Sequence, residues 1–407
     1  MFAAAVRRYR STYEGLPRDA WALSGILFIN MSGTMVVFFL SLYLTRHLGF
    51  TVIRAGQVLS GYGFGMLLGN LLGGLASDRL GARLTQRLSL ALSGVFLISL
   101  GFFRDFPGVL ALMFLYGVSA AALFPANASA LAEICAPEIR SRGFVLSRLA
   151  NNLGVTIGPV VGGFLAGRHY GLLFWVDGTT CLLAALAFYA VFPTGRRSGT
   201  VADKGTRPRP LAWRRDGIMI SILILTVGLS TVFSQLFGTF PLYLKSVYGL
   251  TERLIGPLFA VNTVLIVIFQ MPLTHAVERF KRGRVAAAGA LFLGAGLSLL
   301  PLSRGLLYGA ATVAVWTVGE MLMMPTLVTM ISLRAPDGAQ GQYQGAFGVA
   351  FGVGSVLGPA LGTRLYEAFG GSVLWPAAGG LCLVLAAGFL VLKSDPSPPG
   401  ATGSEAA

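Results

Sequence analysis

The sequence predicts an all-α integral membrane protein whose twelve transmembrane helices form two parallel six-helix repeats. Three observations predict this fold. Of the 407 residues, 55% are hydrophobic and only 12% are charged, whereas soluble domains carry about 25% charged residues. About 20 mostly apolar residues are needed to cross a bilayer, and twelve such stretches follow one another along the chain. The two halves of the chain also repeat at a constant offset of 200 residues.

The predicted spans are separated by short polar loops and, once, by a longer polar segment. The first six lie near residues 20–44, 55–77, 85–103, 107–132, 143–166 and 172–192. The second six lie near residues 217–244, 254–276, 285–303, 306–331, 343–365 and 373–392. We interpret the polar, basic segment 193–216 as a cytoplasmic linker between an N-terminal half, 1–192, and a C-terminal half, 217–393. The tail 394–407 is rich in Pro, Gly and Ser, a composition that predicts disorder.

The basic residues predict the orientation of the chain. Most of the 31 Lys and Arg residues fall on one side of the membrane if the N-terminus is cytoplasmic, as the positive-inside rule requires. Both termini and the linker are therefore expected in the cytoplasm. The first 21 residues lack the apolar core and cleavage site of a secretory signal, so we expect no processing. Because the basic residues sit in short loops between apolar spans, the net charge of +15 does not indicate nucleic-acid binding.

Matches at the offset of 200 are spread over several spans. Leu42-Tyr43-Leu44 recurs as Leu242-Tyr243-Leu244. Further matches join Gly49, Thr51 and Gly56 to Gly249, Thr251 and Gly256, Asp78-Arg79 to Glu278-Arg279, and Pro125 to Pro325. One common offset predicts two repeats of the same topology, related by an axis along the membrane normal.

The loop between the second and third spans, Gly74 to Arg83, combines glycines with charges. Gly74 allows its helix to pack closely, and Gly81 permits a tight turn with positive φ. Asp78 and Arg79 stand at a helix end, where an acid can pair with bases or with a neighbouring helix N-terminus. The alternative is an ordinary basic loop that follows the positive-inside rule.

This loop resembles the G-x-x-x-D-R-x-G-x-[RK] signature of the major facilitator superfamily. The resemblance implies a latch that holds the two halves in an outward-open state. The residues assigned to it are Gly74, Asp78, Arg79, Gly81 and Arg83. The second half echoes it at Glu278-Arg279 without the glycine pattern, so a gating role there is less specific. Glu133 and Arg148 lie near the same side of the membrane, and we expect them to join the charges around Asp78 and Arg79.

The fifth span contains glycines at i, i+4 and i+8, which line one helix face and admit a neighbouring backbone. It resembles the pattern G-x-x-x-G-P-x-x-G-G, which in the family is associated with antiporters, mostly exporters of drugs and metabolites. The matching residues are Gly154, Gly158, Pro159, Gly162 and Gly163, and the second half repeats Gly354, Gly358, Pro359 and Gly362. Symmetric packing alone also explains both copies, so import stays open beside export.

The resemblance covers nearly the whole chain and is closest to the twelve-helix drug:proton antiporter group. It implies a proton-coupled secondary transporter that exports a small amphiphilic molecule by alternating access, with the substrate bound between the halves. It further implies a monomer in a lipid bilayer, in a bacterial-type cytoplasmic (inner) membrane. The alternatives are an importer or facilitator of a small metabolite and, more distantly, a membrane sensor, scaffold or enzyme.

Two carboxylates within predicted spans are candidates for proton coupling. Ionisable groups inside a bilayer are costly and usually functional. Glu320 lies near the middle of the tenth span, and Asp177 lies about a turn and a half inside the sixth. A protonated structural Glu, a substrate contact, or a capping role for Asp177 are the alternatives.

Polar and aromatic residues within the spans are candidates for the substrate cavity. They are Asn30, Tyr62, Tyr116, Gln235, Asn262 and Trp316, although helix packing is the commoner use of such residues.

The sequence contains no motif of an enzyme or an ATP-driven pump: there is no P-loop, H-E-x-x-H or G-x-S-x-G. The three histidines and three cysteines are scattered, so we expect no metal site, no disulfide framework and no cofactor.

Overall fold

The computed structural model describes residues 15–136, 139–193, 214, 216–336 and 339–392. The predicted tail 394–407 and most of the predicted linker 193–216 lie outside the described residues. Within them the fold is helical throughout and contains no strand, which confirms the all-α fold class.

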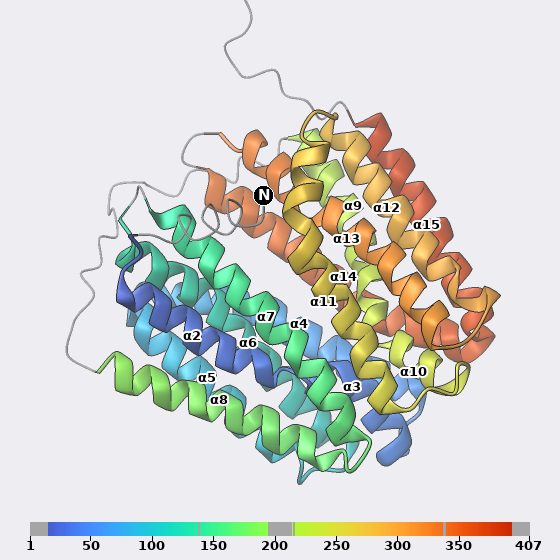
Figure 1. Ribbon diagram of the computed structural model, residues 1–407, viewed down its shortest axis with the longest axis horizontal. Helices are drawn as coiled ribbons and strands as arrows, with labels where there is room; N and C mark the ends of the chain where they lie inside the picture. Colours follow the sequence, from blue (N-terminus) through green and yellow to red (C-terminus); the bar gives the residue numbers. More distant parts are fainter. Residues whose placement is uncertain (1–14, 137–138, 194–213, 215, 337–338, 393–407) are drawn as a thin grey trace, which may run out of the picture.

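Each predicted span corresponds to a helix or to a pair of short helices (Figure 1). The N-terminal helices are α2 (Arg18–Gly33), α3 (Val36–Leu42), η1 (Tyr43–His47), α4 (Val52–Leu80), α5 (Ala82–Leu100), α6 (Phe106–Ile134), α7 (Arg140–Ala166) and α8 (Gly171–Val191). The C-terminal helices are α9 (Gly217–Phe233), η3 (Ser234–Leu236), α10 (Thr239–Ser246), α11 (Glu252–Val277), α12 (Arg282–Ser298), η4 (Leu300–Leu302), α13 (Leu306–Arg334), α14 (Gln340–Phe369) and α15 (Gly371–Val391).

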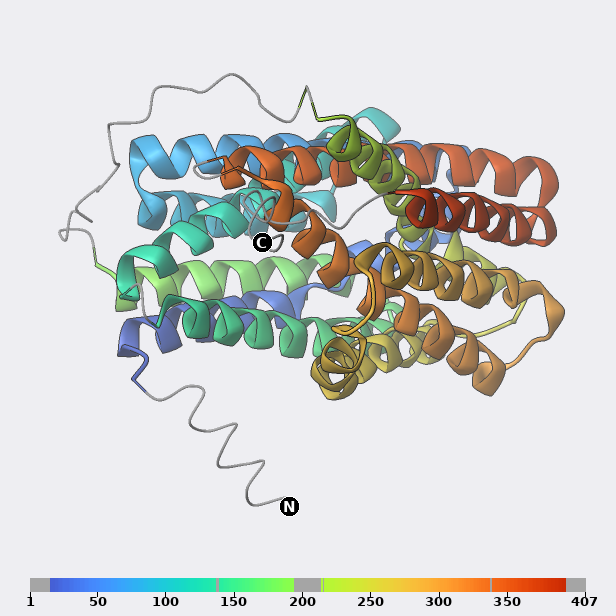
Figure 2. The same cartoon turned by 90° about the horizontal axis from the view of Figure 1, so that it is seen from above.

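The two halves pack in the same pattern, as their repeated sequences predict. Within the first half, α4 packs on α6, α2 on α7 and α8, and α5 on α6 and α8. Within the second, α11 packs on α13, α9 on α14 and α15, and α12 on α13 and α15. The halves meet through two equivalent pairs, α4 with α14 and α11 with α7. Figure 2 shows the two bundles side by side.

Eleven helical segments of the described chain are long and apolar enough to cross a membrane. The twelfth rod, α5, has 19 residues and carries Arg83 and Arg87 in its first turns. These guanidinium groups lie over the rings of Phe192 and Tyr189, at the end of α8. The charges of α5 are therefore confined to one end of the bundle.

Many large apolar side chains point outward from the bundle. Ile224, Leu186 and Val384 are 65%, 63% and 67% exposed, and each lies in the middle or second half of a long helix. Exposed apolar surface of this extent marks a contact with a membrane or with another apolar surface, and the long apolar helices indicate a membrane. The chain is a multi-pass membrane protein.

The first and seventh spans are each interrupted, which the hydropathy pattern did not predict. The first breaks at Thr34 and Met35, between α2 and α3, and the seventh breaks between α9 and α10 around η3. Each break lies beside one glycine motif. Gly158 of α7 packs on the backbone of Thr34, and Gly358 of α14 packs on the backbone of Thr231. The predicted continuous helices over 20–44 and 217–244 are therefore corrected to pairs of shorter ones.

Candidate functional site

The bundle has two ends that differ in how the halves meet. We call the end that carries the 80–82 turn the signature end, and the end that carries the 48–51 and 247–251 turns the opposite end. At the opposite end, α4 and α14 are in close contact. The hydroxyl of Ser60 donates to the carbonyl of Val356 at 2.8 Å. A Cβ atom at Gly63 would lie 2.8 Å from the carbonyl oxygen of Ser355, so the backbones touch.

The pair α7 and α11 closes the opposite end in the same way. Gly256 of α11 lies against the carbonyl of Pro159, and Gly56 of α4 lies against the carbonyl of Pro359. These four residues are two pairs of positions related by the offset of 200. Pro159 and Gly163 of α7 and Pro359 of α14 therefore contact the other half, whereas Gly154, Gly158 and Gly162 and their repeats Gly354, Gly358 and Gly362 pack within their own half.

Polar side chains also join the halves at the opposite end. The hydroxyl of Tyr170 donates to Glu252 Oε1 at 2.6 Å, and Lys245 Nζ pairs with Glu252 Oε2 at 2.8 Å. The backbone N–H of Ile53 donates to Glu367 Oε2 at 2.9 Å. Glu252 is 8% exposed, so its bonds are shielded from water and hold the opposite end shut.

Towards the signature end, α4 and α14 separate. Leu67 of α4 still packs against Gly352 of α14, where an added Cβ atom would lie 2.7 Å from Leu67 Cδ1. Further along the same helices, Gly348, Gly345 and Gly74 have nothing within 4 Å of a Cβ position. The halves are thus closed at the opposite end and parted at the signature end.

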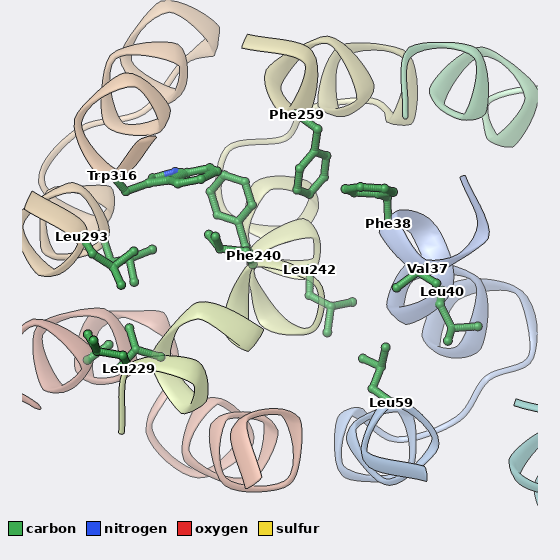
Figure 3. Packing of buried hydrophobic residues seen from close by; sticks show 14 of the residues in the cluster. Val37, Phe38, Leu40, Leu59, Leu229, Phe240, Leu242, Phe259, Leu293 and Trp316 are labelled. Atoms are coloured by element: carbon green, nitrogen blue, oxygen red, sulfur yellow. The ribbon is translucent and has the colours of Figure 1, made fainter. Parts of the chain in front are cut away.

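Aromatic rings fill the space between the halves near the helix breaks (Figure 3). The ring of Phe38 on α3 meets those of Phe259 and Phe237 at 4.9 and 5.4 Å between centroids. Phe240 packs on Phe259 at 5.8 Å. Since Phe38 belongs to one half and its partners to the other, this layer closes the middle of the bundle towards the opposite end.

Glu320 lies half-buried on α13. Asn262 of α11 donates through Nδ2 to Glu320 Oε2 at 2.8 Å and to Thr317 Oγ1 at 3.1 Å. Arg148 of α7, whose side chain is exposed, lies within electrostatic range of the Glu320 carboxylate. A carboxylate of one half and a guanidinium of the other are therefore close enough to interact electrostatically.

Asp177 is 1% exposed and lies on α8. Its Oδ2 atom accepts the backbone N–H groups of Met35 and Val36, each at 3.1 Å. These two groups begin α3 and have no partner within their own helix. Asp177 thus caps the start of α3 at the break in the first span. This is the capping role that the sequence left open as an alternative to proton coupling.

The predicted cavity residues are used in different ways. Gln235 is buried and bridges to the carbonyl of Gly358 at 2.6 Å. Trp316 is buried beside Phe240. Asn262 contacts Glu320. Asn30, Tyr62 and Tyr116 line a small cavity inside the N-terminal half, where the two tyrosine rings stack at 5.6 Å.

The signature loop adopts the predicted turn, with φ of 89° at Gly81. Asp78, Arg79 and Glu133 are exposed, and Glu278 contacts His275, one turn away in sequence, at 3.2 Å. Among the described residues, no ion pair joins Asp78, Arg79, Glu133 and Arg148 into the expected cluster. Arg148 lies instead within electrostatic range of Glu320.

The sequence interpretation missed the polar residues at the opposite end, Glu252, Tyr170, Lys245 and Glu367. It also missed the pair of Asp216 and Arg334 at the signature end, 2.6 Å apart. Asp216 precedes the first residue of α9, a position typical of a helix cap, and that signal was available. The described residues contain no group of three His, Cys, Asp or Glu side chains that could hold a metal ion.

Comparison with known proteins agrees with this geometry. A family model described as Major Facilitator Superfamily matches residues 22–359 and 248–407. A protein of Bacillus subtilis (strain 168) named "Uncharacterized MFS-type transporter YttB" is 28% identical over 340 residues, which cover 81% of this chain and 84% of that protein.

Two further relatives carry functional names. The "Na(+), Li(+), K(+)/H(+) antiporter" of Planococcus maritimus is 25% identical over 79% of this chain and 83% of its own. "Multidrug resistance protein MdtH" of Aeromonas hydrophila is 23% identical over 68% of this chain and 69% of its own.

Among solved structures, a POT family transporter in complex with 5-aminolevulinic acid superposes with a TM-score of 0.79 at 16% identity, covering 93% of this chain and 96% of that one. This likeness supports the fold.

Proposed function

Because the chain belongs to the Major Facilitator Superfamily, we propose that it is a proton-coupled secondary transporter that exports a small amphiphilic molecule by alternating access. The single observation that carries the proposal is Glu320, a half-buried carboxylate in the middle of α13 that accepts a hydrogen bond from Asn262 and lies within electrostatic range of Arg148 of the other half. A charge at this depth is costly and usually functional.

The arrangement of the halves supports alternating access. The halves are in contact at the opposite end and separated at the signature end. This arrangement corresponds to one of the two states that alternating access requires, open to one side of the membrane and closed to the other. With the topology predicted from the basic residues, the signature end is cytoplasmic and this state faces inward. The latch predicted at the signature loop belongs to the outward-open state. Among the residues that the structure describes, Asp78 has no ion-pair partner, which is consistent with an inward-facing state.

Glu320 provides a means of coupling a proton to this rearrangement. While Glu320 is ionised, it attracts Arg148 across the space between the halves. Protonation of Glu320 removes this attraction. A proton on Glu320 therefore changes the relative free energy of the two states, which is what coupling requires. Asp177, the other carboxylate predicted to carry protons, is taken up by the break in the first span, so we assign coupling to Glu320.

Relatives support export more than import. The names of two of them refer to multidrug resistance and to proton antiport, and the glycine motif of α7 resembles the antiporter pattern. The apolar, aromatic layer around Phe38 and Phe259 would suit an amphiphilic substrate.

Flux in proteoliposomes would test this function and its direction. With a pH gradient imposed and a panel of cationic and neutral fluorescent amphiphiles as substrates, an exporter moves solute against the direction of proton flow. Movement of solute in the same direction as protons would identify an importer. Identical fluxes in protein-containing and empty vesicles, for every solute, would contradict transport.

A further inference from the structure

A pocket that the proposed coupling does not use lies between α11, α12 and α13. Its volume is about 400 Å³, within the range of small-molecule sites. The lining residues come from the end of α11 and the turn after it, the start of α12 and the signature-end half of α13. None of them belongs to the N-terminal half, and Glu320 and Asn262 are not among them. The pocket therefore belongs to the C-terminal half alone.

The equivalent helices of the first half approach each other more closely, because α4 packs on α6 through glycines. A Cβ atom at Gly65 or Gly69 of α4 would lie 2.2 Å from a carbonyl oxygen of α6. At the offset of 200, these positions of α11 are Leu265 and Phe269. Side chains of this size prevent α11 from approaching the backbone of α13 in the same way. The pocket thus reflects a difference between the two repeats.

A side chain bridges α11 and α13 where the pocket begins. Gln270 Nε2 donates to the carbonyl of Met321, a lining residue, at 3.0 Å. From there the lining follows α13 as far as Thr329, a distance of about 12 Å at the rise of an α-helix. The pocket is therefore elongated along helices that cross the membrane.

The walls of this pocket are mainly apolar. Its three threonines, Thr274, Thr326 and Thr329, each donate the hydroxyl proton to the carbonyl four residues earlier in the same helix. These hydroxyls therefore have no proton left to donate into the pocket. Apart from the threonines and the α11–α12 turn, the lining consists of valine, methionine, leucine and proline side chains. Such walls suit hydrocarbon better than a free polar solute.

The charged lining residues gather at one end of the pocket. Glu278 and Arg282 both lie at the turn that joins α11 to α12. One membrane-crossing segment ends just before this turn and the next begins within it, so the turn marks the membrane surface. Three further basic residues of the turn, Arg279, Lys281 and Arg284, are exposed. The mouth of the pocket therefore carries an excess of positive charge.

The acid of this turn already has a partner. Glu278 Oε1 lies 3.2 Å from His275 Nδ1. Phe280 lines the pocket and is 50% exposed, and the guanidinium of Arg279 lies over its ring at 5.0 Å from the centroid. Aromatic rings and long basic side chains are typical of the boundary between hydrocarbon and headgroups. The mouth thus has the composition of a headgroup site.

We propose that this pocket binds an anionic phospholipid, with one acyl chain between α11 and α13 and the phosphate at Arg282. Basic side chains at the mouth attract a phosphate, and their excess over acid favours an anionic lipid over a zwitterionic one. The apolar walls below accept hydrocarbon, whereas a soluble anion would find no partner along them. The lipid fills the space that glycine contacts close between α4 and α6, and it holds α11 against α13. The inference does not depend on which solute the protein carries.

Photo-crosslinking of the full-length protein in vesicles tests the site. The probe is a phosphatidylglycerol with a diazirine in one acyl chain, present as a trace component of phosphatidylcholine vesicles. We expect labelling at pocket residues such as Met321 and Val285, with saturable competition by unlabelled phosphatidylglycerol. Arg282→Gln should raise the competing concentration about fivefold, the effect of one basic residue near a membrane surface. Thr329→Trp, which places a large ring in the pocket, should abolish the labelling.

Two matched variants serve as controls. Arg79→Gln removes the same charge from the equivalent turn of the first half, at the repeat position of Arg279. Thr179→Trp adds the same ring at another exposed threonine that donates to the carbonyl four residues earlier. Both variants should keep the labelling and its competition at the wild-type level.

Three outcomes would overturn the proposal. A phosphatidylcholine probe with the same diazirine chain that labels these residues as strongly would mean that the pocket holds bulk lipid without recognising its headgroup. Competition by glycerol phosphate at the same concentration would mean a site for soluble phosphate. Labelling that keeps its wild-type strength in both Arg282→Gln and Thr329→Trp would mean that the lipid does not occupy this pocket.

Discussion

The carbonyl of Pro159 on α7 lies against Gly256 on α11, so close that a methyl group at Gly256 would overlap it. The same contact recurs between Pro359 and Gly56. At each of these two symmetric points, a helix backbone of one half contacts a helix backbone of the other. A side chain larger than hydrogen does not fit at Gly256 or Gly56.

The first prediction is that Gly256→Ala opens the opposite end. The added methyl group should cost this closed state about 1–3 kcal/mol, which shifts the equilibrium between states about 5- to 150-fold. Distances between spin labels at exposed Arg46 and Ser372, one on each half, should lengthen. Gly25→Ala, where a Cβ atom meets nothing within 4 Å, is the control. Unchanged distances in Gly256→Ala would show that this contact does not hold the state.

The second prediction concerns the point where α4 and α14 part. In a background without Cys135, Cys181 and Cys382, the pair Leu67→Cys and Gly352→Cys should form a disulfide readily, because these positions touch. The pair Leu71→Cys and Gly348→Cys, one turn nearer the signature end, should form one only when that end closes.

Combining the second pair with Gly256→Ala should therefore increase its disulfide yield. Yields that are equal for both pairs in the otherwise wild-type protein would contradict the separation of these helices. The yields can be measured by cleaving the chain between the halves and running a non-reducing gel. Only chains with the disulfide then keep the mobility of the uncut protein.

Much of the fold follows from the sequence because apolar length and the repeat at 200 residues determine the number and order of helices. The break at Met35 does not, because it lies inside a stretch that is apolar enough on average to be read as one continuous span. Its N–H groups are satisfied by Asp177, 142 residues away, and such a partner is not visible in local hydropathy.

The candidate site was predictable to a similar degree. A carboxylate alone in an apolar span singled out Glu320. The glycine pattern indicated close approach of a backbone, but which backbone depends on how the halves dock. Arg148 was expected near Asp78 because both are near one membrane face, and its electrostatic interaction with Glu320 depends on how the halves dock.

The third prediction separates anchoring from proton transfer at Asp177. Asp177→Asn keeps an oxygen that can accept the N–H groups of Met35 and Val36, so fold and proton-driven transport should persist. Asp177→Leu leaves both groups unpaired, at about 1–3 kcal/mol each, and should lower the Tm or the yield of folded protein. Loss of gradient-driven transport in a fully folded Asp177→Asn protein would instead support the proton-carrying role.

The fourth prediction concerns pH and Asp216. Burial raises the pKa of Asp216, but hydrogen bonds from Arg334 and from the N–H of Met219 outweigh burial and hold the pKa below its usual value. The stabilisation is therefore present above about pH 4, the ordinary pKa of Asp, and is lost as the pH falls through the lowered value.

Asp216→Asn should accordingly lower the Tm at neutral pH, and the difference from wild type should shrink in strong acid. Asp105→Asn, which alters a helix cap that accepts only the N–H of Gly108 among the described contacts, serves as a control with a smaller effect. A difference for Asp216→Asn that stays constant from neutral to strongly acidic pH would contradict the ion pair with Arg334.

The most direct test of the account is gradient-driven accumulation of a transported amphiphile by Glu320→Gln in proteoliposomes. Glutamine keeps the hydrogen bond with Asn262 but cannot exchange a proton. The account predicts that the variant folds, exchanges labelled for unlabelled substrate, and fails to concentrate substrate when a pH gradient is imposed. Accumulation at the wild-type level, driven by the pH gradient, would contradict the assignment of proton coupling to Glu320.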